Sequence, residues 1–317
     1  MAQLAAFWAK LTMLVSTIRF SDIVDILIVA YLIYNVIMLI RKTNSYRLAQ
    51  GVLLILIAIF APLIAPCDPN LQDYTAILQA PSKLHLLGTD EYGRDILSRI
   101  IYGTRVSLSV GILAQVIATI IGVTMGSLAA YYGGWVDMLL MRITEIFSSL
   151  PFLPFAMMLS YVIRTMPIGE NTRIFIIMII LGLLSWTGLA RMIRAQVLAE
   201  REKEFVIAAK SMGVKENRIA FKHILPNVIS IILVNITLDF AGCMLTESSL
   251  SYLGFGVQQP QPTWGNMLNG ANNSIVIQNF WWQWLFPAIA LSVATISINI
   301  IGDTLRDVLD PKSSQEK

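Results

Sequence analysis

The sequence is poor in charge, in cysteine and in histidine. Only 14% of its 317 residues are Asp, Glu, Lys or Arg, whereas a soluble domain usually has about 25%. The two cysteines, Cys67 and Cys243, stand far apart, which excludes a disulfide scaffold. Because there are only two histidines, His85 and His223, and no spaced cluster of ligands, we expect no metal and no cofactor in this chain. The net charge of +3 is too small and too scattered to predict a nucleic-acid partner.

Long apolar runs are what the sequence has in abundance. Hydrophobic residues make up 56% of the chain, and the charged residues cluster between the apolar runs. A membrane-spanning helix needs about 20 mostly apolar residues, and open strands cannot satisfy their backbone groups in lipid. The alternation typical of a transmembrane barrel is absent. We therefore predict an all-α polytopic membrane protein, with spans near residues 23–40, 48–65, 106–130, 143–163, 174–190, 224–246 and 283–301.

The basic residues between the spans predict the orientation, because cytoplasmic loops carry more Lys and Arg. Segment 191–223 carries eight of them and segment 247–282 carries none, so we expect the first inside and the second outside. The tail after Gly302 is then cytoplasmic, and an odd number of spans puts the N-terminus outside. Segment 66–105 is expected outside although it carries four basic residues, Lys83, Arg94, Arg99 and Arg105.

The segment 200–226 is the most informative about function. Gly213 suits the left-handed residue at a helix end, a second short helix is expected to follow from Lys215, and Pro226 suits the first turn of the next span. Periodicity alone fits two interpretations: an elbow that docks on a soluble partner, or an amphipathic loop on the lipid headgroups. The first helix would present residues at i, i+3, i+4 and i+7, namely Phe205, Ala208, Ala209 and Met212.

The whole pattern resembles a known loop. The Ala-Ala pair, Gly213, and then His223, Leu225 and Pro226 are similar to the "EAA" loop of binding-protein-dependent ABC importer permeases. In that family the loop docks on the ATP-hydrolysing subunit, so the resemblance implies the same role for these residues. The Glu of the motif is replaced by Ile207, and a contact made by that Glu is not carried over.

Three further motifs resemble the C-type permease subunit of the peptide/nickel importer family. Residues 86–108 have its Gly-Thr-Asp, Gly-Arg-Asp and Tyr-Gly-x-Arg elements, residues 247–265 its Leu-Ser-x-Leu-Gly and Trp-Gly elements, and residues 302–311 its Gly-Asp-x-Leu-Arg-Asp ending. The resemblance covers about residues 58–311 and implies a type I ABC importer transmembrane domain of six core helices, with one extra helix before them.

This resemblance implies a non-enzymatic permease subunit in a bacterial cytoplasmic (inner) membrane. The expected partners are a second permease, two ATPase subunits that hold ATP and Mg, and an extracytoplasmic solute-binding protein. The substrate would be a dipeptide, an oligopeptide or a related solute such as a nickel chelate. The alternative function is a self-contained secondary transporter, which would need ion-coordinating groups at midplane in two halves of the chain.

Several motifs also have a purely structural interpretation. Gly88 and Gly93 have the spacing of a phosphate loop, but Arg-Asp follows in place of Lys-Ser or Lys-Thr, so we reject nucleotide binding there. The charges that follow are expected to form ion pairs that fix an outer helix: Asp90, Arg94, Asp95 and Arg99.

Four residues are candidates for the pathway or a gate. Asp239 is an ionisable group within a predicted span, which is costly in lipid, and Asn235 lies one turn before it. Asp239 also fits a hydrogen-bonded packing residue or a position nearer the outer interface. Glu247 and Trp264 bound a Gly- and Pro-containing loop, which fits a gate, a cap or a plain structural loop, with Trp264 anchored at the membrane interface.

The first part of the chain departs from the importer pattern. Residues 18–57 resemble the membrane-anchoring start of membrane-bound diadenylate cyclases, although no cyclase catalytic signature follows. We therefore expect three parts: an atypical N-terminal transmembrane segment at 1–57, the importer transmembrane domain at 58–311 and a cytoplasmic tail at 312–317.

Overall fold

The computed structural model describes residues 46–214, 216–219 and 224–309. The chain divides into two compact units, Met1–Val52 and Leu53–Lys317. The described part of the first unit is the beginning of helix α3, Tyr46–Ile59. The predicted span 23–40 lies outside the described residues. All other described elements belong to the second unit.

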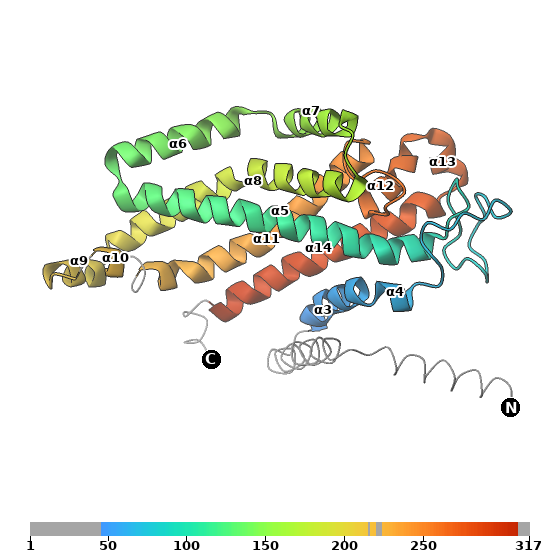
Figure 1. Cartoon of the computed structure of the whole chain (residues 1–317). Coiled ribbons are helices and arrows are strands. Elements are labelled where there is room, and N and C mark those ends of the chain that lie inside the picture. The colour runs from blue at the N-terminus through green and yellow to red at the C-terminus, as the bar shows by residue number, and fades with distance from the viewer. Residues whose placement is uncertain (1–45, 215, 220–223, 310–317) are drawn as a thin grey trace, which may run out of the picture. The chain divides into compact units, whose positions relative to one another are not determined.

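Four long helices form the body of the second unit (Figure 1): α5 (Ile96–Tyr132), α8 (Glu170–Arg201), α11 (Leu225–Tyr252) and α14 (Trp282–Leu309). Helix α5 packs along α8, and α11 packs against α5, α8 and α14. Helices α5, α8 and α14 run in one direction and α11 in the other. Within the described ranges, the one β-type pairing is an isolated bridge between Thr89 and Asp95. The predicted all-helical class is confirmed.

The same four helices are long and apolar enough to cross a membrane, and they cover the predicted spans 106–130, 174–190, 224–246 and 283–301. The predicted span 48–65 does not form a single helix in the structure. Helix α3 ends at Ile59 after 14 residues, and a separate four-residue helix, α4 (Ala61–Ile64), follows it. The structure therefore interrupts the predicted span at Phe60, and the helix before this break is described from Tyr46 onward.

The predicted span 143–163 is likewise divided into two helices. The chain forms α6 (Gly134–Ser149) and α7 (Phe152–Thr165) there, and the two are bent by 78° at the break between them. Pro151 causes the break, because it lacks an N–H and forces the residue before it out of the helical region. Leu150 accordingly has an extended backbone, with φ −71° and ψ 128°. The pair counts as at most one further span.

Small residues set the distance between α5 and α8. A Cβ on Gly126 would overlap the Ala190 carbonyl oxygen, and one on Gly182 would lie 2.7 Å from the Ala114 oxygen. A Cβ on Gly122 would lie 3.1 Å from the Cβ of Leu189. The Gly122-x3-Gly126 spacing, with Gly182 opposite, therefore lets α5 and α8 pack closely.

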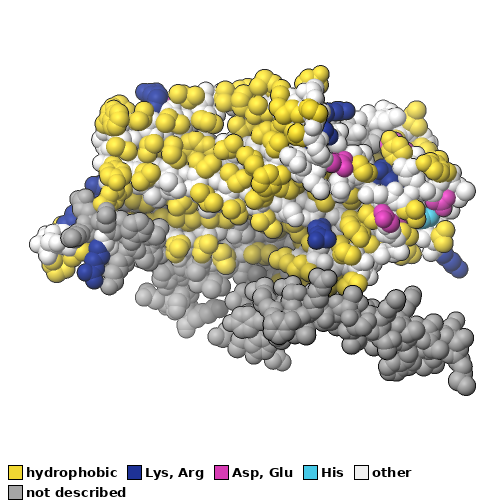
Figure 2. Space-filling model, in the orientation of Figure 1, with side chains coloured by type: hydrophobic (Ala, Val, Ile, Leu, Met, Phe, Trp, Pro, Cys, Tyr) yellow, Lys and Arg dark blue, Asp and Glu magenta, His cyan; other side chains and the backbone are white. Residues whose placement is uncertain are grey.

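The short helices lie at the two ends of the bundle (Figure 1). One end carries α9 (Glu204–Ser211) and α10 (Glu216–Ile219), and the other carries α12 (Trp264–Leu268), a 3₁₀ turn and α13 (Ser274–Asn279). Between these ends the visible face is covered by apolar side chains, while acidic side chains gather towards the end that carries α12 and α13 (Figure 2). This distribution suits a bundle surrounded by lipid, with polar groups at both water interfaces.

Candidate functional site

The end of the bundle that the basic residues predict to be cytoplasmic carries an elbow, residues 200–226. Its first helix, α9, ends as predicted: Gly213 has a φ of +75°, which glycine adopts without strain. The Gly213 amide donates to the Lys210 carbonyl at 2.9 Å, and the Val214 amide donates to the Ala209 carbonyl at 3.1 Å. These two bonds form a Schellman motif, which fixes the direction in which the chain leaves the helix.

The structure divides the predicted stripe of α9 between two environments. Ala209 is buried, together with Val206, in a core cluster that includes residues of α5, α8, α10 and α11. Phe205, Ala208 and Met212 are exposed, and 76% of Met212 is accessible. The small side chain of Ala209 therefore lets the chain's own helices approach, whereas the other three residues face outward.

Polar side chains fix the elbow to the bundle. Arg201 Nη1 donates to the carbonyls of Ala130 at 2.6 Å and Tyr131 at 3.3 Å, which satisfies the C-terminal end of α5. Arg194 forms a two-pronged ion pair with Asp137 of α6. Two of the basic residues that predicted the orientation therefore also join helices to one another.

The end of the elbow is only partly described. His223 lies outside the described residues, and the backbone of Leu225 and Pro226 forms the first turn of α11. Pro226 therefore stands where its missing N–H costs nothing, as predicted. Asn227 Nδ2 donates to Glu200 Oε2 at 3.4 Å and so joins the start of α11 to the end of α8.

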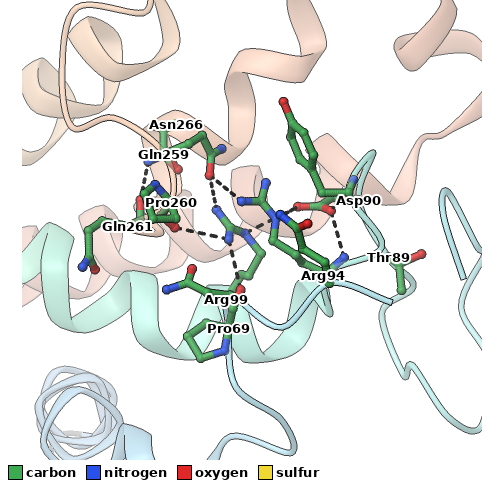
Figure 3. A network of polar contacts seen from close by, with 12 residues as sticks. Pro69, Thr89, Asp90, Arg94, Arg99, Gln259, Pro260, Gln261 and Asn266 are labelled. Carbon is green, nitrogen blue, oxygen red and sulfur yellow. Dashed lines mark hydrogen bonds and ion pairs between the residues drawn. The ribbon is translucent and has the colours of Figure 1, made fainter. Parts of the chain in front are cut away.

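The opposite end of the bundle contains a buried network of charged groups (Figure 3). Asp90 accepts from Arg94 Nε at 2.7 Å, and its carboxylate lies 3.7 Å from Arg99 Nε. Gln259 Oε1 accepts from both arginines, from Arg94 at 2.9 Å and from Arg99 at 2.7 Å. Arg99 Nη1 also donates to the carbonyl of Pro69 at 3.1 Å. The network joins the loop before α5, the first turn of α5 and the loop after α11.

The expected ion pairs are confirmed for Asp90, Arg94 and Arg99, whereas Asp95 pairs with neither arginine. Asp95 is the N-cap of α5 and accepts from the Ser98 amide at 2.8 Å, while its other oxygen lies 3.0 Å from His85 Nδ1. A short polar side chain before a helix caps a free amide there, which competes with ion pairing. Arg99 is also 1% exposed, so these groups are buried and not at the surface.

Gly88 and Gly93 form turns. Their φ values are +80° and +74°, and a Cβ on either would overlap a backbone oxygen, that of Gln79 or Asp73. Both glycines are needed for close backbone packing in this loop.

Trp264 and Glu247 are buried at the same end. Trp264 is 1% exposed, its amide donates to Ser107 Oγ at 3.3 Å, and its Nε1 donates to the Ile100 carbonyl at 3.2 Å. It therefore anchors the loop on α5 inside the protein, and its expected place at the membrane interface is wrong. Glu247 is 0% exposed and accepts from Ser251 Oγ at 2.7 Å. Both residues have the contacts of structural groups.

Asn235 and Asp239 lie in the middle of α11, away from the core clusters. Asn235 is half-buried and donates to the Ile231 carbonyl at 2.8 Å. Asp239 is exposed, and among the described residues it has no hydrogen bond or ion pair. With 14 residues before it and 13 after it in α11, it does not lie near an end of the helix.

Sequence reasoning did not identify Gln259. This residue lies in the loop after α11, some 160 residues after Arg94 and Arg99, and its side chain accepts a hydrogen bond from each of them. A neutral amide in a Gln- and Pro-rich run gives no local signal of such a contact. Within the described ranges, no group of three or more His, Cys, Asp and Glu could hold a metal ion.

Comparisons with known proteins agree with the geometry. A family model described as "Binding-protein-dependent transport system inner membrane component" matches residues 122–315. A second, "N-terminal TM domain of oligopeptide transport permease C", matches residues 49–81 and so begins inside the segment predicted to be atypical.

Curated relatives cover most of the chain. The dipeptide transport system permease protein DppC of Alkalihalophilus pseudofirmus is 42% identical over 258 residues, which are 81% of this chain and 82% of that protein. The oligopeptide transport system permease protein OppC of Haemophilus influenzae is 40% identical over 274 residues, 85% of each chain. The OppC of Bacillus subtilis is 38% identical over 262 residues, 82% of this chain and 83% of that protein.

The length of these matches is decisive, because the first family model includes α8, the elbow, α11 and α14, and the relatives align with four fifths or more of the chain. They leave the self-contained secondary transporter without support. The chain belongs to the family of inner membrane components of binding-protein-dependent transport systems.

Proposed function

We propose that the chain is the permease subunit of an ATP-driven importer of dipeptides or oligopeptides. The observation that carries this proposal is the similarity, at about 40% identity and over four fifths of the chain, to permeases named for dipeptide and oligopeptide transport. A related solute such as a nickel chelate is the alternative substrate, because the motifs that the sequence shares with this family do not distinguish the two.

The proposal includes partners that this chain requires. Two ATPase subunits bind ATP and Mg and hydrolyse ATP, a second permease completes the pathway, and an extracytoplasmic protein delivers the solute. The elbow is the part of this chain that contacts an ATPase subunit. Its buried face joins α9 to α8 and α11, so a displacement of α9 is transmitted to two membrane helices.

The outward face of α9 supports this docking. Met212 is 76% exposed and Phe205 is 39% exposed, and both lie on one side of the helix with the exposed Ala208. Apolar side chains grouped on a short helix outside the lipid favour contact with a protein groove. We therefore place the contact on Phe205, Ala208 and Met212, with Ala209 supporting the helix from behind.

The test is a pair of matched methionine variants. Met212→Glu puts a charge into the proposed contact, whereas Met138→Glu changes a methionine on α6 that is 61% exposed and far from the elbow in sequence. We expect Met212→Glu to abolish co-purification of the ATPase subunits and peptide uptake, with the permease still inserted. Full co-purification and uptake with Met212→Glu would contradict the docking role.

We also propose that residues 1–57 are a separate N-terminal segment of the chain. The division of the chain after Val52 supports a boundary near this point. The importer domain then extends to residue 311, and the short tail from 312 lies in the cytoplasm.

A further inference from the structure

Helix α11 carries a polar stripe that the bundle does not cover. The five residues of this stripe are separated along the chain by four, three, four and three positions, which places them within one narrow sector of the α-helix. From the first to the last they extend over about 21 Å, two thirds of a bilayer core of about 30 Å. The polar stripe consists of Asn235, Asp239, Gly242, Thr246 and Ser249.

The position of the stripe relative to the bundle is defined by its neighbours. Cys243, adjacent to Gly242, is buried in a cluster that includes residues of α5 and α8, so α8 borders one edge. Leu238 and Leu245 are exposed and border the other edge. Among the described residues, a Cβ on Gly242 would meet no atom within 4 Å, so none of them covers the middle of the stripe.

The hydrogen bonds of the stripe set Asp239 apart. The Asn235 amide and the hydroxyls of Thr246 and Ser249 each donate to the carbonyl four residues earlier, at 2.8 Å in each case. These groups therefore need no external partner. Within the part of the chain that the structure describes, the Asp239 carboxylate has no hydrogen-bond or ion-pair partner at all.

Lipid is a poor environment for this face. A carboxylate at the centre of a bilayer costs about 2.5–3.5 kcal/mol on insertion scales, and Asp239 lies about 20 Å from either end of α11 at 1.5 Å per residue. The amide and hydroxyl groups beside it are bonded to their own helix and add little to this cost, so the carboxylate decides which environment suits this face. The stripe is thus expected to face water or a polar molecule.

We propose that the polar stripe of α11 lines the route of the transported solute and that Asp239 binds the solute's cationic amino group at mid-membrane. The Asp239 carboxylate supplies the charge complementary to the amino group of the solute. The other polar side chains of the stripe are already bonded to their own helix, so they make only weak contacts and a solute can move past them. A fixed protein partner would instead have to bring a cation to mid-membrane to pair with Asp239. This inference rests on the proposed peptide-import function and adds a specificity-determining residue to it.

The test compares two solutes that differ in one charge. The complex with its binding protein and ATPase subunits is reconstituted in liposomes, and uptake of trialanine is measured against uptake of N-acetyl-trialanine, which lacks the amino-terminal charge. We expect Asp239→Asn to lower the ratio of the two uptake rates about tenfold, the factor that corresponds to 1.4 kcal/mol. Asp239→Glu should keep the ratio of the native complex.

The matched control is Glu145→Gln, which removes one acidic charge from an exposed ion pair on α6. It should leave the ratio unchanged. If Asp239→Asn transports both solutes in the native ratio, or loses both equally, the inference is overturned. If the native complex imports neither solute, the proposed function fails instead. Should Asp239→Asn not assemble, Asp239→Ser gives the same comparison, and failure of both neutral variants to assemble would make Asp239 a structural residue.

Thiol labelling tests the route independently of the charge. In a chain without Cys67 and Cys243, a cysteine at Asn235 or Thr246 should react with a water-soluble maleimide in the assembled complex. Leu233 lies two residues before Asn235, on the opposite side of the helix, and is 42% exposed. A cysteine at Leu233 should not react. Absence of reaction at both stripe positions would place them against lipid or a sealed interface and would overturn the inference.

Discussion

Removal of the Arg99 side chain should destabilise the outer end of the bundle. Arg99 donates to three segments that are distant in the sequence: to the carbonyls of Pro69 and Pro260 and to the side chain of Gln259. It is also one of the largest fully buried side chains in the described residues. In Arg99→Ala, the two carbonyls lose a charged donor and the partly buried Asp90 loses one of its two cationic neighbours.

The magnitude follows from burial. Breaking a buried charged pair by removing one partner costs about 3–5 kcal/mol, whereas an exposed ion pair contributes about 0–1 kcal/mol. The chain provides the exposed comparison: Arg142 and Glu145 lie 2.7 Å apart, as Arg94 and Asp90 do, but their side chains are 70% and 59% exposed. Arg142→Ala should therefore have almost no effect on stability.

The assay is thermal unfolding of the purified complex, followed by intrinsic tryptophan fluorescence. For a domain of 150–250 residues, each kcal/mol shifts the midpoint by about 2–4 °C, so we expect Arg99→Ala to lower it by about 6–20 °C. Chymotrypsin should also cut the loop after α11 faster, at Phe255, because Gln259 and Pro260 lose their contact with α5. A midpoint shift no larger than that of Arg142→Ala would refute the reasoning.

Three further changes test other parts of the chain. Gly126→Ala should cost about 1–3 kcal/mol of overpacking against Ala190 and lower the amount of assembled complex, whereas Gly188→Ala, whose Cβ meets no atom within 4 Å, should not. Gly213→Ala should cost about 1–2 kcal/mol of left-handed backbone strain and weaken ATPase-subunit co-purification, which Gly213→Asn should largely restore. Deletion of residues 1–45 should leave the complex assembled if the N-terminal segment is separate, and loss of the complex would contradict that separation.

Local features were predictable because their causes lie within a few residues of the chain. The end of α9 at Gly213 depends on one left-handed glycine, and the start of α11 at Pro226 depends on a residue without an N–H. The same reasoning applied to Pro151 would have identified the break between α6 and α7. There the apolar composition of residues 143–163 received more weight than the proline.

Contacts between distant segments could not be predicted from patterns of this kind. The amphipathic spacing of α9 is correct, but it does not say which neighbour covers which side, so Ala209 was assigned to the docking face although it packs against the bundle. Trp264 is an aromatic residue of the kind found at membrane interfaces, but residues of α5, α11 and α14 bury it. Both outcomes depend on how the helices pack, which a single sequence does not encode locally.

The contacts along α11 suggest how the two ends of the bundle are mechanically joined. At its first turns, Val228 and Ile232 belong to the same core cluster as Val206 of the elbow. At its last turns, a Cβ on Gly265 of α12 would lie 2.5 Å from Cα of Ser248, so the outer loop packs on α11 without room to slide. Because close-packed elements move as units, a displacement of the elbow should move the polar stripe and the outer loop together. The polar stripe lies between these two contacts. A movement of the elbow that is coupled to ATP hydrolysis would therefore change the surroundings of the Asp239 carboxylate.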